Sequence, residues 1–592
     1  MVMKKSWVLT LRLFKKHLAR FFTILAIVFV SVGFMSGVGE AENTLKIKAS
    51  KVYYEQNMSD LYLKSKKKTG FSAEEISKIE EIYGTKNIMK TFCYEFYKDE
   101  KVTRVYAFDL NNQNINKLEI VEGRLPENDS EVLVERETKL YESAKVGDVV
   151  NLDGTNYTVS GVANNPFLMH RVQESSFTKS GKYVKRVFYK NTSSLATIND
   201  IYVTLENREI FDFFSTEYEE AVTKAKDDIT LELGTKNVRA LNLYQNWGLY
   251  SVKKYARTIG KLGEIFVVFF LLITMLIVYS TMVRLLDEER HQIACQKTLG
   301  YTSFSIAKRY VFFVFVATIV GGLLSFGVGL LLTRMIYVGM CAHYELPNLD
   351  GLISVSYYFA TFAMILFATC LLTLLTGLRV ASRRPSELMR PKMAEAKRKL
   401  LIERIPFVWN PLKFRYKSTI RNIFLFKGRF LMTVISIIGS SVLVTGGLGL
   451  YDSVSNYEGM EVLIAISVFV ILFSAVLSSL VIYNITNINV SERQREIATL
   501  MVVGYRPKEI TGYIFREIYI MCFIGALVGI PFGYWFMTYV FDVLGFGSVT
   551  EIRSWVWIAS PILTMLFSFF ATLLLKPKIL KVDMNGSLKI NE

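Results

Sequence analysis

The chain has 592 residues, of which 51% are hydrophobic, and its formal net charge at pH 7 is +17. A soluble protein of this length would divide into several domains with polar surfaces and a lower apolar fraction, so these values exclude an ordinary soluble protein. The positive charge could indicate nucleic-acid binding, but the Lys and Arg residues crowd segments that would all lie on one side of a membrane. We therefore expect a membrane protein without a nucleic-acid partner.

Eight runs of mostly apolar residues follow one another along the chain, and each is long enough to cross a bilayer as a helix of about 20 residues. Lys and Arg are frequent before the first run and in the loop 379–429, whereas the loops 337–355 and 451–461 contain none. The positive-inside rule then places both termini in the cytoplasm and residues 42–262 outside the plasma membrane. The runs are 21–41, 264–286, 310–336, 356–378, 430–450, 462–486, 514–540 and 555–575.

The first run begins with basic residues and ends with small ones, as a signal peptide does. Its apolar stretch is longer than that of a signal peptide, so we expect it to remain as the first transmembrane helix. The five cysteines are scattered and the four histidines show no metal-ligand spacing, which predicts neither a disulfide framework nor a metal site. His170 beside Arg171 is typical of a surface pair rather than of a general base, and no catalytic residues are assigned.

The long segment 42–262 has the pattern of a mixed α/β domain. Ser72 and Glu75 form a capping-box pattern that opens a helix. Asp153-Gly154 stands between two strand-like runs and predicts a hairpin. A polar helix is expected over 207–227.

The second and sixth apolar runs each lead into a charged helix that ends in Gly-Tyr. The two sequences are DEERHQIACQKTLGY (287–301) and SERQREIATLMVVGY (491–505), and they align at a shift of 204 residues. Glycine suits the end of such a helix, because positive φ there lets the backbone satisfy the last carbonyls. From the residues alone, each helix could either dock a partner protein or lie on lipid headgroups.

The helices that follow align at the same shift, and small residues recur in them four apart. This spacing makes a flat helix face that another membrane helix can approach closely. The leading helices align at a shift of 409 instead, so the first half carries an insertion of 205 residues (409 − 204). Each half has four helices, which predicts parallel repeats packed as a pseudo-dimer. The small residues are Gly321, Ser325 and Gly329 in the first half and Gly525, Gly529 and Gly533 in the second.

These features together resemble the permease subunits of FtsX/MacB-like (type VII) ABC transporters. The second charged helix carries the family pattern E-R-x-R-E-I-A…G, and the first departs from it at Glu289, His291 and Gln292. The resemblance also rests on residues 122–136 and 146–166, which are similar to the periplasmic core domain of MacB-like permeases, and on the basic tails 382–390 and 581–589.

The resemblance implies that each charged helix is a coupling helix against a cytoplasmic ABC ATPase, and that one chain binds two ATPase copies. The chain contains no GxxxxGK[ST] or LSGGQ-like motif, so ATP is expected in that partner and no cofactor in this chain. Membrane lipid and an extracytoplasmic partner or substrate are also expected. The residues assigned to ATPase docking are Glu288, Glu289, Arg290, Gln292, Ile293, Leu299, Gly300, Tyr301, Glu492, Arg493, Arg495, Glu496, Ile497, Gly504 and Tyr505.

By resemblance, the chain would transmit the movement of the ATPases through the membrane, to export or resist an amphiphilic compound or antimicrobial peptide. The alternative is a transducer that controls an envelope enzyme without transport, and a membrane enzyme ranks last for want of a site. The expected parts are 1–41 (N-terminal helix and first span), 42–262 (extracytoplasmic domain), 263–390 (rest of the first FtsX-like repeat), 391–428 (cytoplasmic linker) and 429–592 (second repeat).

Overall fold

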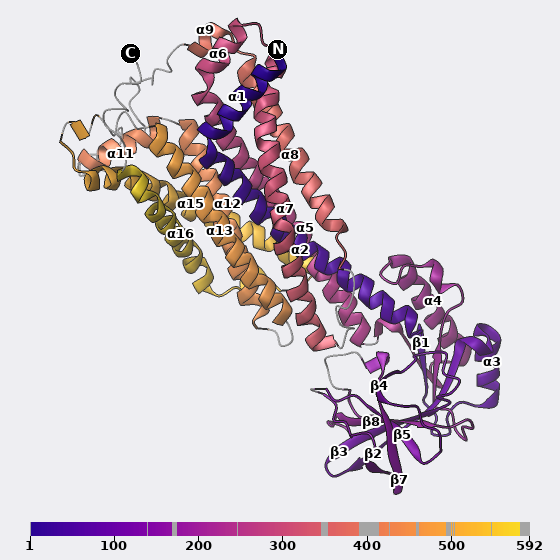
Figure 1. The fold of residues 1–592 in the computed structure, drawn as a ribbon. Helices are drawn as coiled ribbons and strands as arrows, with labels where there is room; N and C mark the ends of the chain where they lie inside the picture. Colours follow the sequence, from indigo (N-terminus) through magenta and orange to yellow (C-terminus); the bar gives the residue numbers. More distant parts are fainter. Residues whose placement is uncertain are drawn as a thin grey trace. The chain divides into compact units, whose positions relative to one another are not determined.

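The computed structural model describes residues 2–138, 140–168, 174–245, 247–344, 353–389, 414–425, 427–456, 461–492, 499, 501–502, 504–545 and 547–580. The chain forms two compact units (Figure 1). Met1–Ala41, Ile259–Ile336 and Ser354–Glu592 make up the membrane unit, and Glu42–Thr258 with Tyr337–Ile353 make up the α/β unit.

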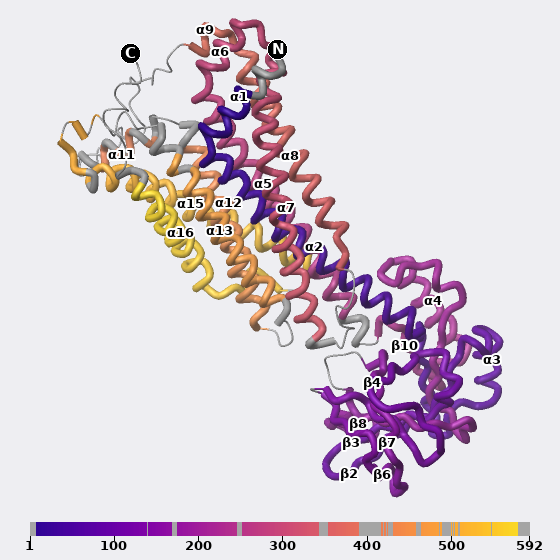
Figure 2. Tube along the Cα trace, viewed as in Figure 1, coloured from indigo at the N-terminus to yellow at the C-terminus, as the bar shows by residue number. Residues whose placement is uncertain are grey.

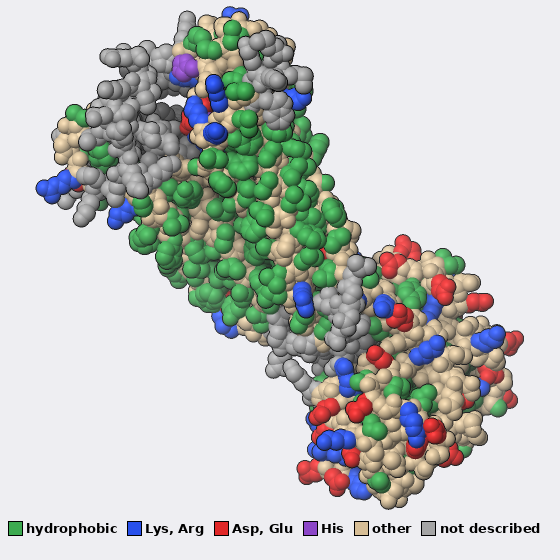
Figure 3. All heavy atoms as spheres, in the orientation of Figure 1, with side chains coloured by type: hydrophobic (Ala, Val, Ile, Leu, Met, Phe, Trp, Pro, Cys, Tyr) green, Lys and Arg blue, Asp and Glu red, His purple; other side chains and the backbone are tan. Residues whose placement is uncertain are grey.

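The membrane unit is built from eight long helices that are apolar enough to cross a bilayer. A helix satisfies its backbone polar groups internally, which the hydrocarbon core requires. Figure 3 shows hydrophobic side chains covering the visible face of this unit. The chain is a multi-pass membrane protein, and the prediction of eight spans is confirmed. The helices are α2 (Leu18–Glu55), α5 (Trp247–Glu288), α7 (Ser303–Tyr344), α8 (Ser356–Ala381), α12 (Lys427–Val454), α13 (Glu461–Glu492), α15 (Pro507–Leu544) and α16 (Ser554–Leu580).

Shorter helices lie together at one end of the membrane unit (Figures 1 and 2). They include α1 (Val2–Lys16), α6 (Arg290–Thr298), α9 (Pro385–Met389) and α11 (Phe414–Leu425). At the shift of 409 residues, α11 falls on α1, and the first residue of α12 falls on the first residue of α2. α11 is thus the second copy of α1, and the second repeat begins inside the expected linker 391–428. The sequence of α11 alternates basic and apolar residues and contains no apolar run. We therefore predicted no helix there from the sequence.

The same close helix contacts occur in both repeats. In the first repeat α7 packs on α2, where a Cβ added to Gly329 would lie 2.5 Å from Oγ of Ser36. In the second repeat α15 packs on α12, where a Cβ added to Gly533 would lie 3.0 Å from the side chain of Thr445. Gly533 corresponds to Gly329 at the shift of 204, and Thr445 corresponds to Ser36 at the shift of 409. Further contacts of this kind join Gly321 to Leu25 and Val28, Ser325 to Gly33, Gly525 to Val434 and Ile437, and Gly529 to Ser441.

The two repeats contact each other through α2 and α5 of the first repeat and α13 and α15 of the second. The ring of Phe34 in α2 lies 5.1 Å from that of Phe473 in α13, measured between centroids. Nδ2 of Asn484 in α13 donates a hydrogen bond of 2.7 Å to Oγ1 of Thr281 in α5. Nζ of Lys261 in α5 donates to the carbonyl oxygen of Val543 in α15 at 2.8 Å. α2 and α5 of one repeat therefore pack against the second repeat, as a pseudo-dimer requires.

The α/β unit contains a mixed sheet whose strand order is β10-β1-β9-β2-β3-β8-β5-β7-β4, with β6 paired to β7. Antiparallel pairs predominate, and β3–β8 and β5–β7 are parallel. The strands are β1 (Leu61–Ser65), β2 (Ile88–Lys98), β3 (Lys101–Phe108), β4 (Glu119–Gly123), β5 (Glu131–Glu135), β6 (Val149–Leu152), β7 (Thr155–Asn164), β8 (Val184–Asn191), β9 (Asp200–Val203) and β10 (Val238–Asn242).

Local patterns in this unit form largely as their sequences predict. Ser72 and Glu75 make both hydrogen bonds of the capping box that opens α3 (Ala73–Tyr83). Asp153 and Gly154 have φ of 50° and 89° and connect β6 to β7, as in a type I′ hairpin. The polar helix α4 (Thr216–Leu233) begins nine residues later than expected at 207, because Ser215 caps it and the preceding phenylalanines pack in the core.

The end of the sheet around β1 has two different faces. Leu61, Leu63, Ile201 and Val203 point to one face and pack with α3 and α4 in a hydrophobic core. Side chains alternate along a strand, so the residues between them point to the opposite face. There, Tyr62 and Lys64 of β1 stand beside Tyr202 and Asp200 of β9. Aromatic and charged side chains thus share the sheet face opposite to the hydrophobic core formed with α3 and α4.

Candidate functional site

The first charged segment forms a short helix, α6, between two long membrane helices. α5 ends at Glu288, Glu289 precedes the first residue of α6, and α7 begins at Ser303. At its C-terminus the N–H of Gly300 donates to the carbonyl of Lys297 at 3.0 Å, and the N–H of Tyr301 donates to that of Gln296 at 3.1 Å. Gly300 has φ of 89°, so these contacts form a Schellman motif that ends the helix.

The start of α6 is fastened to the junction of α1 and α2 by ion pairs. Oε1 of Glu289, which is 2% exposed, lies 2.9 Å from Nε2 of His17 and 2.7 Å from Nζ of Lys16. Glu288 forms a second ion pair with Arg20 of α2. These contacts connect residues about 270 positions apart in sequence. We call Glu289, His17 and Lys16 the anchor cluster.

The electrostatics of the anchor cluster keep Glu289 ionised. Burial acts to raise the pKa of the Glu289 carboxyl, but hydrogen bonds and charges from His17 and Lys16 outweigh burial, and its pKa lies below the usual value. A buried carboxylate is stable in this form only while its charged partners are present, because an unpaired buried charge is costly.

The inner face of α6 is held by two further elements. Ile293 and Ala294 are fully buried. Arg309 of α7 donates a hydrogen bond of 2.9 Å to Oε1 of Gln296. Nζ of Lys297 donates to the carbonyl oxygen of Arg383, just before α9, at 2.8 Å. α6 is therefore bound to α1, α7 and the segment that leads into α9.

The outer face of α6 is open to solvent. His291, Gln292 and Cys295 are exposed along it. At its end, Leu299 is 76% exposed and Phe304, in the first turn of α7, is 59% exposed. Polar side chains next to two projecting apolar ones form a surface of the kind that a partner protein can cover.

The structure separates the predicted docking residues of the first repeat into two groups. Glu288, Gln292, Leu299 and Gly300 are exposed, and Arg290 and Tyr301 are half-buried. Glu289 and Ile293 are instead buried within the chain, and their assignment to ATPase docking stays a prediction. The reason is helical periodicity, because positions four apart lie on one face, and Ile293 follows Glu289 inward.

In the second repeat, Arg493, Arg495, Glu496 and Ile497 lie outside the described residues. Glu492 is the last residue of α13. Gly504 has φ of 98° and donates to the carbonyl of Met501 at 3.1 Å, as Gly300 donates to Lys297. Tyr505 is 47% exposed. The ends of the two charged segments thus share one backbone geometry.

Sequence reasoning missed two buried carboxylates that join the first and fourth helices of each repeat. Oε2 of Glu40 in α2 accepts hydrogen bonds from the N–H groups of Tyr357 and Tyr358, in the first turn of α8, at 2.8 and 3.2 Å. Oδ2 of Asp452 in α12 accepts one from the N–H of Arg553, just before α16, at 2.8 Å. A carboxylate at a helix N-terminus satisfies free N–H groups and complements the helix dipole. The sequence signal for these contacts was an acidic residue at or just after the end of the first and the fifth apolar runs, namely Glu40 and Asp452.

Comparison with known families agrees with this repeated geometry. The model of the FtsX-like permease C-terminal family matches residues 264–385 and 468–584. The chain contains two copies of the FtsX-like permease C-terminal domain. The two matches begin 204 residues apart, which is the shift that aligns the charged segments. FtsX-family permeases are the membrane components of ABC transporters and pair with ABC ATPase subunits. No curated protein matches the chain.

Proposed function

We propose that this FtsX-like permease transmits the movement of two ABC ATPase subunits to its α/β unit. α6 and the segment 491–505 would be the two docking points, and ATP would bind in the partner subunits. The observation that supports this most is the position of α6. Its outer face, with Gln292 and Leu299, is exposed, while its inner face is fixed to three other helices or turns.

The contacts of α6 make it suited to passing on a displacement. Glu289 connects it to α1, Gln296 to α7, and Lys297 to the turn that follows α8. A push on the outer face would therefore act on several long helices at once. The boundaries between the two units fall inside α2, after Ala41, and inside α5, after Thr258, so the chain connections there are helical.

For the cargo, we propose an amphiphilic compound such as an antimicrobial peptide, which the complex exports or resists. The long helices expose apolar side chains on their outer faces, including Phe367, Trp535 and Leu574. Such faces are accessible to molecules dissolved in the lipid. The termini would lie in the cytoplasm with the ATPases, and the α/β unit would lie outside.

Cys295 offers a direct test of docking, because it is exposed on the outer face of α6. A photoreactive maleimide attached to Cys295 should cross-link an ABC ATPase in native membranes, identified by mass spectrometry of its P-loop peptide. Cys295→Ser should abolish the product. In the Cys295→Ser background, labelling at a cysteine introduced for Lys145, which is exposed in the α/β unit, should give no ATPase adduct. An ATPase adduct from that position but not from Cys295 would contradict the proposal.

The proposed cargo needs a separate test. Deletion of the chain should increase susceptibility to amphiphilic peptides, and a hydrolysis-deficient ATPase partner should have the same effect. Unchanged susceptibility across a broad panel, together with loss of a cell-wall hydrolase activity bound to residues 42–262, would instead support the transducer alternative.

A further inference from the structure

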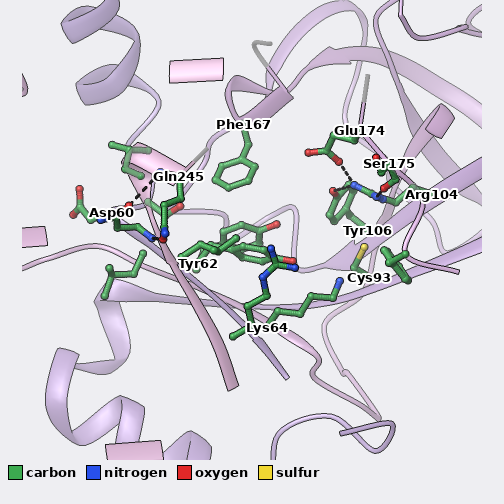
Figure 4. A pocket seen from close by; sticks show the side chains of 18 residues that line it. Asp60, Tyr62, Lys64, Cys93, Arg104, Tyr106, Phe167, Glu174, Ser175 and Gln245 are labelled. Atoms are coloured by element: carbon green, nitrogen blue, oxygen red, sulfur yellow. Dashed lines mark hydrogen bonds and ion pairs between the residues drawn. The ribbon is translucent and has the colours of Figure 1, made fainter. Parts of the chain in front are cut away.

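The α/β unit contains a cavity of about 380 Å³ on the sheet face that carries aromatic and charged side chains. Its volume is within the range of small-molecule sites. Figure 4 shows Phe167, Tyr62 and Lys64 in the middle of this cavity, between an end lined by Asp60 and an end lined by Arg104 and Glu174. Strands β1, β9 and β10 form its floor.

The apolar part of the cavity is a cluster of three aromatic rings. Tyr62 and Tyr202 are stacked, with centroids 5.0 Å apart and an angle of 22° between the rings. Phe167 stands nearly edge-on to both, at 5.9 Å from Tyr62 and 5.3 Å from Tyr202. Two stacked rings and a third at an angle offer flat apolar surfaces on which another planar group can pack.

The charged part places two cations next to each other. Lys64 of β1 lies directly opposite Arg239 of β10 in the antiparallel pair. Like charges in this position repel each other, so the pair destabilises the sheet unless an anion lies between or beside them. Lys64 is partly compensated, because its Nζ lies 3.7 Å from Oδ1 of Asp200 and 4.0 Å from the ring centroid of Phe177.

The other charges that line the cavity are already paired. Arg104 is paired with Glu95 and Glu174, and Asp60 lies 3.6 Å from Arg208. Among the residues that the structure describes, Arg239 has no carboxylate within ion-pair distance. Arg239 is therefore the cation of the lining that has no ion-pair partner among the described residues, and it lies on the strand next to Tyr62 and Lys64.

β10 is an edge strand, and basic residues on edge strands often serve only to prevent pairing with another sheet. Lys64 does not fit that role, because it lies on the next strand inward and its ammonium group is over the ring of Phe177. We propose that this cavity binds a small organic anion with a planar, aromatic body. Arg239 and Lys64 bind its carboxylate or similar group, and Tyr62, Tyr202 and Phe167 pack on its ring.

The test uses the full chain in nanodiscs of uncharged phospholipid, with naphthoate as the probe and naphthamide and naphthylmethylammonium as its neutral and cationic counterparts. Saturation-transfer NMR should show saturable naphthoate binding that weakens as salt concentration rises. Arg239→Gln should weaken it about tenfold or more, which is the loss expected for one charge-assisted hydrogen bond. Arg239→Lys should retain most of the affinity, and Lys145→Gln should change nothing.

Three results would overturn the proposal: equal affinity for naphthoate and naphthamide, preference for the cationic probe, or unchanged affinity in Arg239→Gln. Absence of saturable naphthoate binding would overturn it as well. The salt dependence needs no variant, so the proposal stays testable even if a substitution disturbs folding. Binding is measured without ATP or a partner, and its failure leaves the proposed ATPase coupling untouched.

Discussion

Oε1 of Glu289 lies 2.9 Å from Nε2 of His17, and this contact joins the start of α6 to the junction of α1 and α2 in the same repeat. It gives α6 a fixed inner side, so that only its outer side is available to a partner. Glu289 therefore takes part in an internal connection of the chain.

Replacing Glu289 with Gln should lower the free energy of unfolding by about 2–3 kcal/mol, because His17 and Lys16 lose their charged acceptor. Thermal unfolding of the purified protein measures this loss, and ATP-dependent activity of the complex should fall with it. Glu387→Gln on the exposed surface of α9 is the matched control and should change neither. If the double exchange Lys16→Glu with Glu289→Lys restores no stability, the assigned ion pair is wrong.

The pH dependence of the α/β unit should reveal a buried carboxyl group. Burial raises the pKa of Glu135 from 4.5 to about 8, although the hydroxyl group of Tyr189 donates a hydrogen bond to it. A raised pKa means that the folded state prefers the protonated acid, so its stabilising contribution is complete below pH 4.5 and is lost as pH rises toward 8. The slope is at most about 1.4 kcal/mol per pH unit.

Melting temperatures, measured by tyrosine fluorescence at pH values between 5 and 8 about one pH unit apart, test this expectation. The decline with pH should become smaller in Glu135→Gln, although burial also raises the pKa values of Asp60 and Asp200, and it should be unchanged in Glu122→Gln, whose side chain is exposed on β4. An equal decline in all three proteins would exclude Glu135 as its source.

Two glycines of α7 allow a matched test of helix packing. A Cβ at Gly321 would lie 2.6 Å from the carbonyl oxygen of Leu25, whereas a Cβ at Gly327 would meet nothing within 4 Å. We expect Gly321→Ala to cost about 1–3 kcal/mol, because the backbone of α2 must move. Gly327→Ala should be neutral or slightly stabilising, since alanine favours the helix by up to about 1 kcal/mol. Similar unfolding temperatures for both variants would contradict the close contact.

Gly300 and Gly504 should respond to substitution through backbone conformation. Both have positive φ, and a Cβ at either position would meet no neighbouring atom, so crowding is not the cause. Valine should cost about 1–2 kcal/mol by disfavouring the left-handed conformation, and asparagine should be milder. The expected functional result is loss of ATP-linked activity with the membrane unit still folded. Full activity of both valine variants would show that the ends of these segments do not matter for coupling.

The carboxylates at the ends of α2 and α12 should contribute similarly to the two repeats. Glu40→Gln and Asp452→Asn each weaken hydrogen bonds to the start of another helix, which should cost about 1 kcal/mol. Glu264→Gln, an exposed acid on α5, is the control. A loss confined to one repeat, measured by thermal unfolding, would show that the two capping contacts are not equivalent.

Sequence patterns were sufficient for the features that repeat locally. Apolar runs identified the eight spans, the shifts of 204 and 409 identified the repeats, and the capping box at Ser72 identified the start of α3. The spans and the capping box depend on residues within a few turns of one another, and the repeats need only a comparison of the sequence with itself. The copy of α1 at Phe414–Leu425 escaped notice because an amphipathic basic helix resembles a linker in composition.

The orientation of α6 could not be read from its own sequence. Whether Glu289 faces a partner or the protein interior depends on His17 and Lys16, which are far away in the chain. The sequence contained one sign of this orientation, because the first repeat departs from the family pattern at Glu289. At the shift of 409, the positions of Lys16 and His17 correspond to Leu425 and Phe426, so the acid and its bases are both peculiar to the first repeat.

This correlated difference has an evolutionary consequence. The two repeats arose by duplication, but their parts are no longer interchangeable. A recombination that joined the first charged segment to the second copy of α1 would combine Glu289 with Leu425 and Phe426 at the sequence positions of Lys16 and His17. The resulting chain would contain a buried acid without a base, and selection would remove it. Because Lys16, His17 and Glu289 all belong to the first repeat, an exchange between the halves that moved Glu289 without its bases would break the anchor cluster.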